Sequence, residues 1–522
     1  MDYIKSIQDI LSGAFADLKE IPKTDRVLKS TKIEQEIFND LYNESMVLPS
    51  CEKDGARKLK SFPPLVRDVF QSVYGLKARF TEDEELSAIS KEFNKNILEN
   101  LMSDEQYSAI KSVCEGKELP SMGATEEFVT SIYHNLSSLM NKATGGKGQV
   151  NGLDIMEQDK QELTQKLMSE IEEYKEAVGE EKGKIGEMAM QMAKRISDKA
   201  EQLKNFTAIV QKHTAQNQKA VRAEIAKAAG AALEKANDIR CALASWGNDA
   251  GEMHKNPINT EILKRVAKSE KLRYISKYLG RYKEMLSSKR LAGYTYGRGE
   301  KYDIEYGNNI SKCLTSELAM LSSPELVPLF VRKYQNKALK QYRRREPEFK
   351  GKGDIIVCLD ESHSTFGENN AYGMAIAMVL FEICRINKAN FALVHFSTKT
   401  KVDYFPKDKE IDTKRIMDCA ETFLSGGTDF EQPLREVFAL NAKGQMTKPD
   451  IVFITDGQCD LPDDFLEVFN KFKKESGAKL TGILLDYGEN IEFSLKKFAD
   501  YIYRTSELLK DEIMEKLIDE RI

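Results

Sequence analysis

The chain has 522 residues, of which 31% are charged, and its net charge is −5 at neutral pH. A chain of this length is too long to fold around a single hydrophobic core, so two or three domains are expected. The acidic balance disfavours a nucleic-acid-binding protein, and no apolar run approaches the roughly 20 residues of a membrane-spanning helix.

The eight cysteines are scattered, and no two form a C-x-x-C pair. Neither a zinc site nor a disulfide framework is therefore expected. The N-terminus, MDYIKSIQDI, lacks the basic start and apolar block of a signal peptide. These features predict a cytoplasmic protein without a transmembrane segment.

Residues 1–143 are predicted to form an N-terminal helical domain, since convincing strand alternation is scarce there. Residues 144–152 (TGGKGQVNG) are rich in glycine and are predicted to be a flexible linker. This segment lacks the G-x-x-x-x-G-K-[ST] spacing of a phosphate-binding loop.

Residues 153–271 are predicted to form long helices. The stretch 157–246 is rich in Ala, Glu, Lys and Gln, all favourable in helices. Gly179, Gly183 and Gly186 are expected to mark a turn between two arms. A helical hairpin or coiled-coil arm is one interpretation. Two long helices of a bundle are slightly favoured, and heptads are not sustained.

Residues 272–353 are predicted to be a helical connector that packs on the C-terminal domain. The basic cluster Arg343, Arg344 and Arg345, with Lys340 nearby, has two interpretations. It could bind an acidic partner surface. The favoured interpretation is a solvated helix end, where arginine interacts well with the negative end of the helix dipole.

Residues 354–522 alternate short apolar runs with helical segments, which predicts a doubly wound, mostly parallel sheet. Strands are expected at 355–359, 391–396, 401–405, 451–454, 480–485 and 501–504. Helices are expected at 370–388, 412–423, 430–440, from 462, at 491–499 and in the tail from 506. The fold class is therefore α plus α/β, with an all-helical region before the sheet.

Oxygen-bearing side chains follow two of these predicted strands. Asp360, Ser362 and Ser364 come directly after the apolar run IIVCL, and Asp456 follows IVFIT. Thr428 stands in the intervening segment GGTD. The carboxyl ends of parallel strands meet at one edge of a sheet, where α/β proteins bind ligands.

These ligands suit a hard cation such as Mg²⁺, or else Mn²⁺ or Ca²⁺. Hydroxyl groups are neutral, so Asp360 and Asp456 must supply the charge. The ion is then left short of one carboxylate, which a partner could provide. The alternative is an ordinary α/β domain with Ser and Asp in its turns, but turn chemistry alone would not place all five residues at strand ends.

The pattern D-x-S-x-S, then a distant Thr and a distant Asp, resembles the metal-ion-dependent adhesion site of von Willebrand factor A (VWA) domains. The matching positions are Asp360, Ser362, Ser364, Thr428 and Asp456. Many such domains have Gly between the two serines, whereas this chain has His363, which a positive φ would strain. His363 is expected to be a surface residue, because imidazole suits zinc better than magnesium.

The segments L-T-S-E-L-A at 314–319 and L-F-V-R-K-Y at 329–334, followed by I-I-V-C-L-D, look like the ViaA/CoxE group of VWA-domain proteins. Trp246 followed by Gly247 also fits that group. The resemblance implies a partnership with a MoxR-type (RavA-like) AAA+ ATPase in chaperone-like remodelling or maturation of protein complexes. It also implies a non-catalytic adaptor whose client offers an acidic residue to the metal.

Enzymatic alternatives lack their motifs. The chain has neither a Walker motif nor a G-x-S-x-G nucleophile elbow, and Ser362 stands where a haloacid-type phosphatase needs its second Asp. The expectation is therefore a protein that is not an enzyme. An RNA-binding scaffold of the Ro type, which joins a helical region to a VWA domain, is the alternative function. Net acidity and the lack of a visible repeat count against it.

Overall fold

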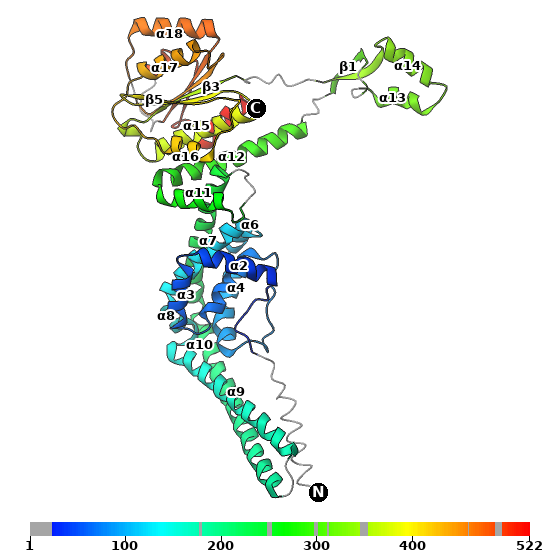
Figure 1. Ribbon diagram of the computed structural model, residues 1–522, viewed down its shortest axis with the longest axis vertical. Coiled ribbons are helices and arrows are strands. Elements are labelled where there is room, and N and C mark those ends of the chain that lie inside the picture. Colours follow the sequence, from blue (N-terminus) through cyan, green and yellow to red (C-terminus); the bar gives the residue numbers. More distant parts are fainter. Residues whose placement is uncertain are drawn as a thin grey trace. The chain divides into compact units, whose positions relative to one another are not determined.

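The computed structural model describes residues 23–176, 180–247, 253–296, 301–308, 310, 313–344, 353–457, 459–485 and 493–521 (Figure 1). Contacts divide the chain into two units. The first comprises Met1–Arg240 with Gly251–Glu261, and the second comprises Cys241–Ala250 with Ile262–Ile522. Among the described helices, none is both long enough and apolar enough to cross a membrane.

The described part of the first unit is helical, as predicted. Its apolar side chains form one core that contains Phe62, Phe70, Phe93 and Phe128, each at most 1% exposed. The helices before the long pair are α2 (Lys32–Glu44), α3 (Leu48–Ala56), α4 (Phe62–Tyr74), the π-helical turn η1 (Ser90–Asn94), α5 (Lys95–Met102), α6 (Tyr107–Cys114), α7 (Glu118–His134) and α8 (Leu136–Thr144).

A buried carboxylate on α4 holds the segment that precedes α2. Asp68 is fully buried, and its oxygens accept hydrogen bonds from Val27 N at 2.7 Å, Leu28 N at 3.3 Å and Arg26 Nε at 2.7 Å. Burial raises the pKa of Asp68 to about 6, against the opposing effect of Arg26. Asp68 therefore satisfies three donors that would otherwise lack partners in the core.

The prediction of a flexible linker at residues 144–152 is wrong for most of its length. Helix α8 ends at Thr144, and α9 (Lys147–Glu176) begins three residues later. Gly145 and Gly146 have φ of 87° and 116°, and their N–H groups bond to the last carbonyls of α8. Two glycines are enough to end one helix and start the next, so a glycine-rich composition here marks a cap.

Helix α9 and the 67-residue helix α10 (Glu180–Trp246) lie side by side as a hairpin (Figure 1). Leu167 and Ile171 of α9 pack with Ala189 of α10. Further along α10, Val221 and Ile225 are fully buried in the helical core. The stretch thus combines both interpretations, a hairpin arm and a bundle. Of the three glycines expected at the turn, Gly183 and Gly186 lie inside α10, and Gly179 is outside the described residues.

The second unit contains the predicted sheet, with six strands in the order β5-β4-β3-β6-β7-β8 among the described residues. All neighbouring pairs are parallel except β4 and β5. The strands are β3 (Ile355–Asp360), β4 (Phe391–Phe396), β5 (Thr400–Phe405), β6 (Asp450–Thr455), β7 (Lys479–Leu484) and β8 (Tyr501–Arg504).

Helices cover both faces of this sheet (Figure 1). Along β3, Val357 and Leu359 join the core under α12 and α15, whereas Ile356 and Cys358 join the core under α17 and α18. Burial on both faces explains why the strand is a continuous apolar run. The helices are α11 (Pro257–Lys268), α12 (Glu270–Tyr296), η4 (His363–Thr365), α15 (Glu368–Asn387), α16 (Thr413–Glu421), α17 (Glu431–Ala442), α18 (Asp463–Ser476), α19 (Phe493–Lys496) and α20 (Lys510–Asp519).

The predicted connector, 272–353, is only partly helical. Strands β1 (Lys301–Gly307) and β2 (Leu339–Arg344) pair antiparallel around the short helices α13 (Thr315–Leu318), η3 (Ala319–Ser322) and α14 (Val327–Gln335). The sequence KYDIEYG of β1 alternates apolar and polar residues, which is typical of a strand. Arg343 and Arg344 lie on β2, so the helix-end interpretation is wrong; Arg345 lies outside the described residues.

Candidate metal centre

The candidate residues meet at the carboxyl edge of the sheet. Asp360 is the last residue of β3, and Asp456 directly follows β6, which pairs with β3 in parallel. From β3 the chain continues to β4 on one side, and from β6 it continues to β7 on the other side. The connections that follow the neighbouring strands β3 and β6 therefore run in opposite directions across the sheet. Such a switch point opens a crevice at the strand ends.

Hydrogen bonds join four of the five predicted ligands. Asp360 Oδ1 accepts from Ser362 N at 2.9 Å, and Ser362 Oγ lies 3.1 Å from Ser364 Oγ. Ser364 Oγ donates to Asp456 Oδ1 at 3.0 Å. Thr455 Oγ1 donates to the other oxygen of Asp360 at 2.5 Å. Side-chain oxygens therefore link the loop that follows β3 (the first loop) to the loop that follows β6 (the third loop). The second loop is the segment between α16 and α17 that carries Thr428.

Thr428 reaches the same edge from the second loop. A Cβ added at Gly457, next to Asp456, would lie 3.6 Å from Thr428 Oγ1. The first and second loops meet where His363 N donates to Gly426 O at 3.0 Å. Gly426 has φ of 122°, and a Cβ there would lie 3.1 Å from Thr398 Oγ1, so this position requires glycine.

The donor set fits a magnesium ion. Octahedral Mg²⁺ with ligands at 2.0–2.1 Å places neighbouring oxygens about 2.9 Å apart. The Ser362–Ser364 and Ser364–Asp456 oxygen separations are 3.1 and 3.0 Å, close to that edge length. Asp360, Ser362, Ser364, Thr428 and Asp456 offer oxygen alone, which favours a hard cation over zinc.

The carboxylates are in an environment that disfavours negative charge. Burial raises the pKa of Asp360 to about 6, with a further contribution from Asp456, although bonds from Thr455 and Ser362 oppose the shift. Burial also raises the pKa of Asp456. A buried carboxyl group beside a half-buried one gains from a bound cation, which stabilises the ionised forms of both.

His363 causes no strain in the first loop. It is exposed and begins the 3₁₀ turn η4. Among the described residues other than glycine, positive φ occurs only at Lys337, Lys388, Ser425 and Lys448. The loop therefore accepts a histidine between the two serines, and the side chain points to solvent as expected.

Glu361 is a buried residue of the candidate site that sequence reasoning did not single out. Its side chain is fully buried, and Oε2 accepts from Leu424 N at 3.0 Å in the second loop. Oε1 lies 2.9 Å from His395 Nδ1 on β4. Glu361 thus ties the loop of Ser362 to the loop of Thr428. The signal in the sequence was a carboxylate placed directly after a buried strand.

A phenylalanine pair lies beside the candidate metal site, and the sequence analysis did not single it out. Phe366, two residues after Ser364, is 73% exposed, and its ring packs edge-on against Phe423 with centroids 5.5 Å apart. Lys271 Nζ lies 5.5 Å from the centroid of the Phe423 ring and donates to Thr422 O. The edge therefore presents an apolar side chain next to its polar centre.

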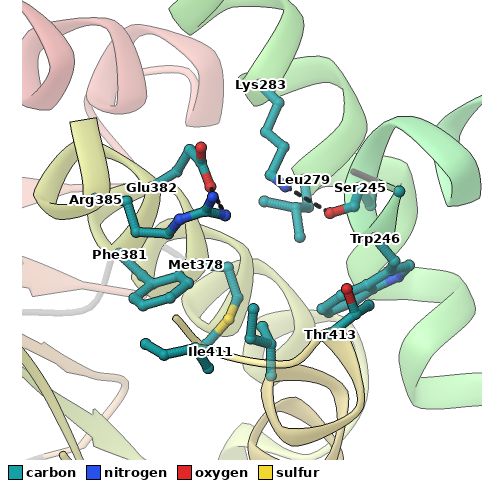
Figure 2. A pocket seen from close by; sticks show the side chains of 12 residues that line it. Ser245, Trp246, Leu279, Lys283, Met378, Phe381, Glu382, Arg385, Ile411 and Thr413 are labelled. Carbon is teal, nitrogen blue, oxygen red and sulfur yellow. Dashed lines mark hydrogen bonds and ion pairs between the residues drawn. The ribbon is translucent and has the colours of Figure 1, made fainter. Parts of the chain in front are cut away.

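A separate cavity of about 180 Å³ lies within the second unit, between the end of α10 and helices α12, α15 and α16 (Figure 2). Its lining includes Trp246, Lys283, Phe381 and Arg385. Lys283 Nζ donates to Ser245 O at 2.7 Å, and burial lowers the pKa of Lys283. None of the five candidate ligands lines this cavity.

The chain is similar in sequence to several known proteins, each over part of its length. It is 29% identical over 286 residues to an uncharacterized protein of Methanocaldococcus jannaschii, which covers 54% of this chain and 72% of that protein. It is 26% identical over 235 residues to the regulatory protein ViaA of Edwardsiella ictaluri, which covers 41% of this chain and 47% of ViaA. No family model matches the chain.

Two further similarities are to proteins whose names include a VWFA or vWF domain. A VWFA domain-containing protein of the Acidianus two-tailed virus is 24% identical over 339 residues, covering 60% of this chain and 36% of that protein. The vWF domain of the pili tip protein Mfa5 of Porphyromonas gingivalis is 13% identical, covering 32% of this chain and 96% of that domain, with a TM-score of 0.26. The chain spans about half the length of the ViaA protein that it matches.

Proposed function

Because the chain is a relative of the ViaA regulatory proteins with a VWA-like domain, we propose that it is a non-catalytic, metal-dependent protein-binding adaptor. Its partner is a MoxR-family AAA+ ATPase, and the pair remodels or matures other protein complexes. The observation that carries the proposal is the linked set of side-chain oxygens from Asp360 to Asp456 at the switch point of the sheet.

Asp360, Ser362, Ser364, Thr428 and Asp456 would hold Mg²⁺ or a similar divalent ion. Bound there, the ion supplies an electrophilic position for a carboxylate of the partner. The chain contributes only two acidic ligands, so an acidic residue from outside would complete the charge balance. Glu361 keeps the first and second loops together and thereby positions the hydroxyl ligands.

Phe366 supports a protein partner rather than a small anion. A side chain that is 73% exposed beside a polar centre gives a partner both an apolar contact and a charged one. Interface hot spots often combine an aromatic anchor with a desolvated polar pair. The partner surface is therefore expected to carry an acidic residue next to an apolar pocket.

Capture of the ATPase should require both the metal and Phe366. The full-length chain is immobilised, and the purified MoxR-type ATPase from the same organism is passed over it in Mg²⁺ or in EDTA. We expect capture in Mg²⁺ that falls at least about tenfold in EDTA, and a similar loss for Phe366→Ser, since truncating an aromatic hot spot costs roughly 2 kcal/mol.

Phe366→Ser should retain full Mg²⁺ uptake, which separates loss of the apolar contact from loss of the metal. Tyr501→Ser is a matched control, because Tyr501 is also exposed but lies on β8 at the far edge strand of the sheet. Equal capture in Mg²⁺ and EDTA would contradict the adaptor mechanism. Salt-sensitive binding of RNA in place of the ATPase would favour the Ro-type alternative.

A further inference from the structure

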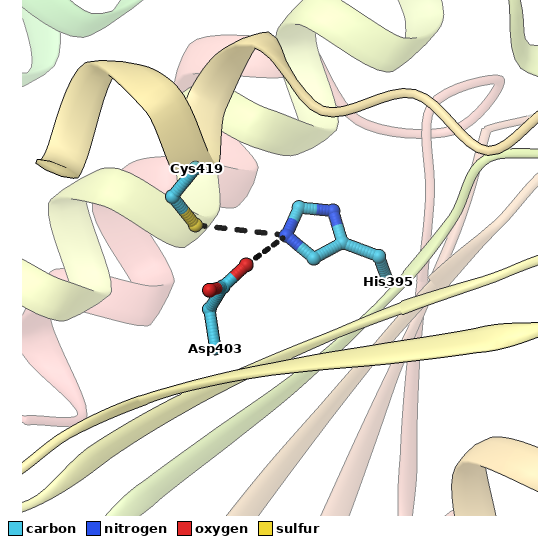
Figure 3. Close-up of side chains that lie close together, drawn as sticks. All are labelled: His395, Asp403 and Cys419. Atoms are coloured by element: carbon cyan, nitrogen blue, oxygen red, sulfur yellow. Dashed lines mark hydrogen bonds and ion pairs between the residues drawn. The ribbon is translucent and has the colours of Figure 1, made fainter.

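A second cluster of potential metal ligands lies in the second unit, apart from the oxygen site formed by Asp360, Ser362, Ser364, Thr428 and Asp456. His395 on β4, Asp403 on β5 and Cys419 on α16 direct their ligand atoms toward one another (Figure 3). In the register of β4 and β5, His395 pairs with Lys401, so His395 and Asp403 share the face that α16 covers. Three elements therefore converge on one point.

The distances match a tetrahedral metal site. Zinc bonds of about 2.0 Å to nitrogen and oxygen and about 2.3 Å to sulfur place a nitrogen and an oxygen ligand about 3.3 Å apart and a nitrogen and a sulfur ligand about 3.5 Å apart. His395 Nε2 lies 3.3 Å from Asp403 Oδ2 and 3.6 Å from Cys419 Sγ. All three ligand atoms lie within 4.8 Å of one another.

Glu361 prepares the histidine for this role. Its Oε1 lies 2.9 Å from His395 Nδ1, so Nδ1–H can donate to the carboxylate and Nε2 faces Asp403 and Cys419. A carboxylate on the far nitrogen is the usual partner of a metal-bound histidine, because it fixes the tautomer and makes the ring a better ligand.

Access and charge are also suitable. His395 is fully buried and Cys419 is 2% exposed, while the side chain of Asp403 is 20% exposed, so the cluster lies near the surface on its Asp403 side. A thiolate and a carboxylate would neutralise a divalent ion, with water as a fourth ligand. Lys401 Nζ, 3.0 Å from Asp403 Oδ2, would give up that ion pair and keep its bond to Thr422 Oγ1 at 2.9 Å.

Without a metal, the same side chains can form a buried ion-pair network. Burial alone would lower the pKa of His395, but hydrogen bonds to Asp403, Cys419 and Glu361 outweigh it and raise the pKa to about 10. The hydrogen bond with His395 lowers the pKa of Asp403. A metal ion must therefore displace the proton on His395 Nε2 and the proton of the Cys419 thiol. A borderline-soft ion such as Zn²⁺ binds nitrogen and sulfur more strongly than a hard ion does and is therefore better able to displace them.

We infer that His395, Asp403 and Cys419 form a second metal site, for Zn²⁺, joined to the oxygen site through Glu361. Glu361 holds His395 with one oxygen and Leu424 N with the other. Zinc would thus brace the loop that carries Thr428, without contacting the Mg²⁺ ligands. This role is structural, and it does not depend on the proposed partner.

The test uses chelator-treated full-length protein with Mg²⁺ in excess, so that the oxygen site is saturated. Zn²⁺ is titrated against a chromophoric chelator, and Co²⁺ is added as a spectroscopic substitute. We expect one Zn²⁺ per chain and a cobalt spectrum with thiolate charge-transfer absorption and strong tetrahedral d–d bands. Cys419→Ser should remove the charge-transfer absorption and weaken zinc binding at least about 100-fold. A loss of this size exceeds the roughly 10–100-fold loss that is typical when a residue that only hydrogen-bonds to a metal ligand is replaced.

Asp403→Asn provides a second variant in case Cys419→Ser does not fold, and it should lower zinc affinity while the thiolate absorption of bound cobalt persists. Cys459→Ser removes a cysteine outside the cluster and should leave zinc binding unchanged. Asp360→Asn should also leave zinc binding unchanged. A loss of Mg²⁺ binding at the oxygen site can thereby be distinguished from a loss of Zn²⁺ binding at the second site. Absence of thiolate absorption in the unsubstituted protein, or equal zinc affinity in Cys419→Ser, would overturn the inference.

Discussion

Replacing Asp360 with asparagine should reduce Mg²⁺ affinity at least about 100-fold, more than the 10–100-fold typical of an outer-sphere partner. Asp360 supplies one of the two charged ligands, and the amide oxygen of asparagine carries no formal charge. Its neighbours Ser362 and Thr455 can still hydrogen-bond to the side chain. Isothermal titration of the full-length variant with Mg²⁺ measures the change.

The same substitution should not unfold the domain. The pKa of Asp360 is raised to about 6 in the folded protein, so folding disfavours its ionised form at pH 7. Removing that charge relieves repulsion from Asp456, and the melting temperature in EDTA should equal or exceed that of the unsubstituted protein. In Mg²⁺ the order should reverse, because only the unsubstituted protein gains stability from the ion.

Asp429→Asn is the matched control for this experiment. Asp429 follows Thr428 and carries the same charge near the same edge, but its Oδ1 accepts from Glu431 N at 2.9 Å at the start of α17. The side-chain oxygen of asparagine can still accept from Glu431 N, whereas the bond that Asp429 Oδ2 accepts from Gln432 Nε2 at 2.8 Å is lost. Mg²⁺ affinity should stay within about threefold, since a charge outside the coordination shell contributes about 0.6 kcal/mol at most. A comparable loss in both variants would point to a diffuse acidic surface and against a defined site.

Replacing Asp68 with alanine should destabilise the N-terminal helical unit by about 3 kcal/mol or more. The substitution leaves Val27 N, Leu28 N and Arg26 Nε without their acceptor. Asp68 is the buried partner of its ion pair and Arg26 is 26% exposed, so we expect the lower end of the about 3–5 kcal/mol that breaking a buried pair costs. Because a chain with two units need not unfold in one step, amide hydrogen exchange in α4 and in residues 23–31 measures the loss.

Asp83→Ala provides the comparison. Asp83 is 47% exposed and pairs with Lys91 and Lys95 on the surface, where an ion pair contributes about 1 kcal/mol or less. Protection in α4 should change little in this variant. If both variants lost protection equally, Asp68 would act only through the overall charge of the unit.

The parallel sheet could be predicted because β3, β4 and β6 are buried on both faces. Their apolar runs are short and are separated by helical segments, a pattern that few other folds produce. Four of the five candidate ligands, Asp360, Ser362, Ser364 and Asp456, followed from the same pattern, since residues at the ends of parallel strands converge whatever their distance in sequence. Thr428 lies between α16 and α17, and only the resemblance to VWA domains indicated it. The structure brings all five to one edge.

Other features depended on contacts that spacing does not reveal. His395, Asp403 and Cys419 come from two strands and a helix at irregular intervals, so no C-x-x-C or histidine spacing indicates their cluster. Glu361 is buried, and only the fold shows that it faces His395 and Leu424. The two-stranded sheet of β1 and β2 was missed because helical residues on either side of it suggested a continuous connector.

The glycines show that amino-acid composition alone does not distinguish the end of a helix from its interior. Gly145 and Gly146 end a helix with positive φ and permit another to begin at once, whereas Gly183 lies within α10. The same residue type therefore marks a cap in one place and is tolerated inside a long helix in another. Only the hydrogen bonds of the neighbouring backbone distinguish the two cases.

Calorimetric titration of chelator-treated full-length protein with Mg²⁺ and Mn²⁺ tests the candidate metal site most directly. We expect uptake of one ion per chain at the site of Asp360 and Asp456, and no such uptake by Asp360→Asn. A folded protein that takes up neither ion, or an Asp360→Asn variant that takes up as much as the unsubstituted chain, would show that these residues do not form a metal site.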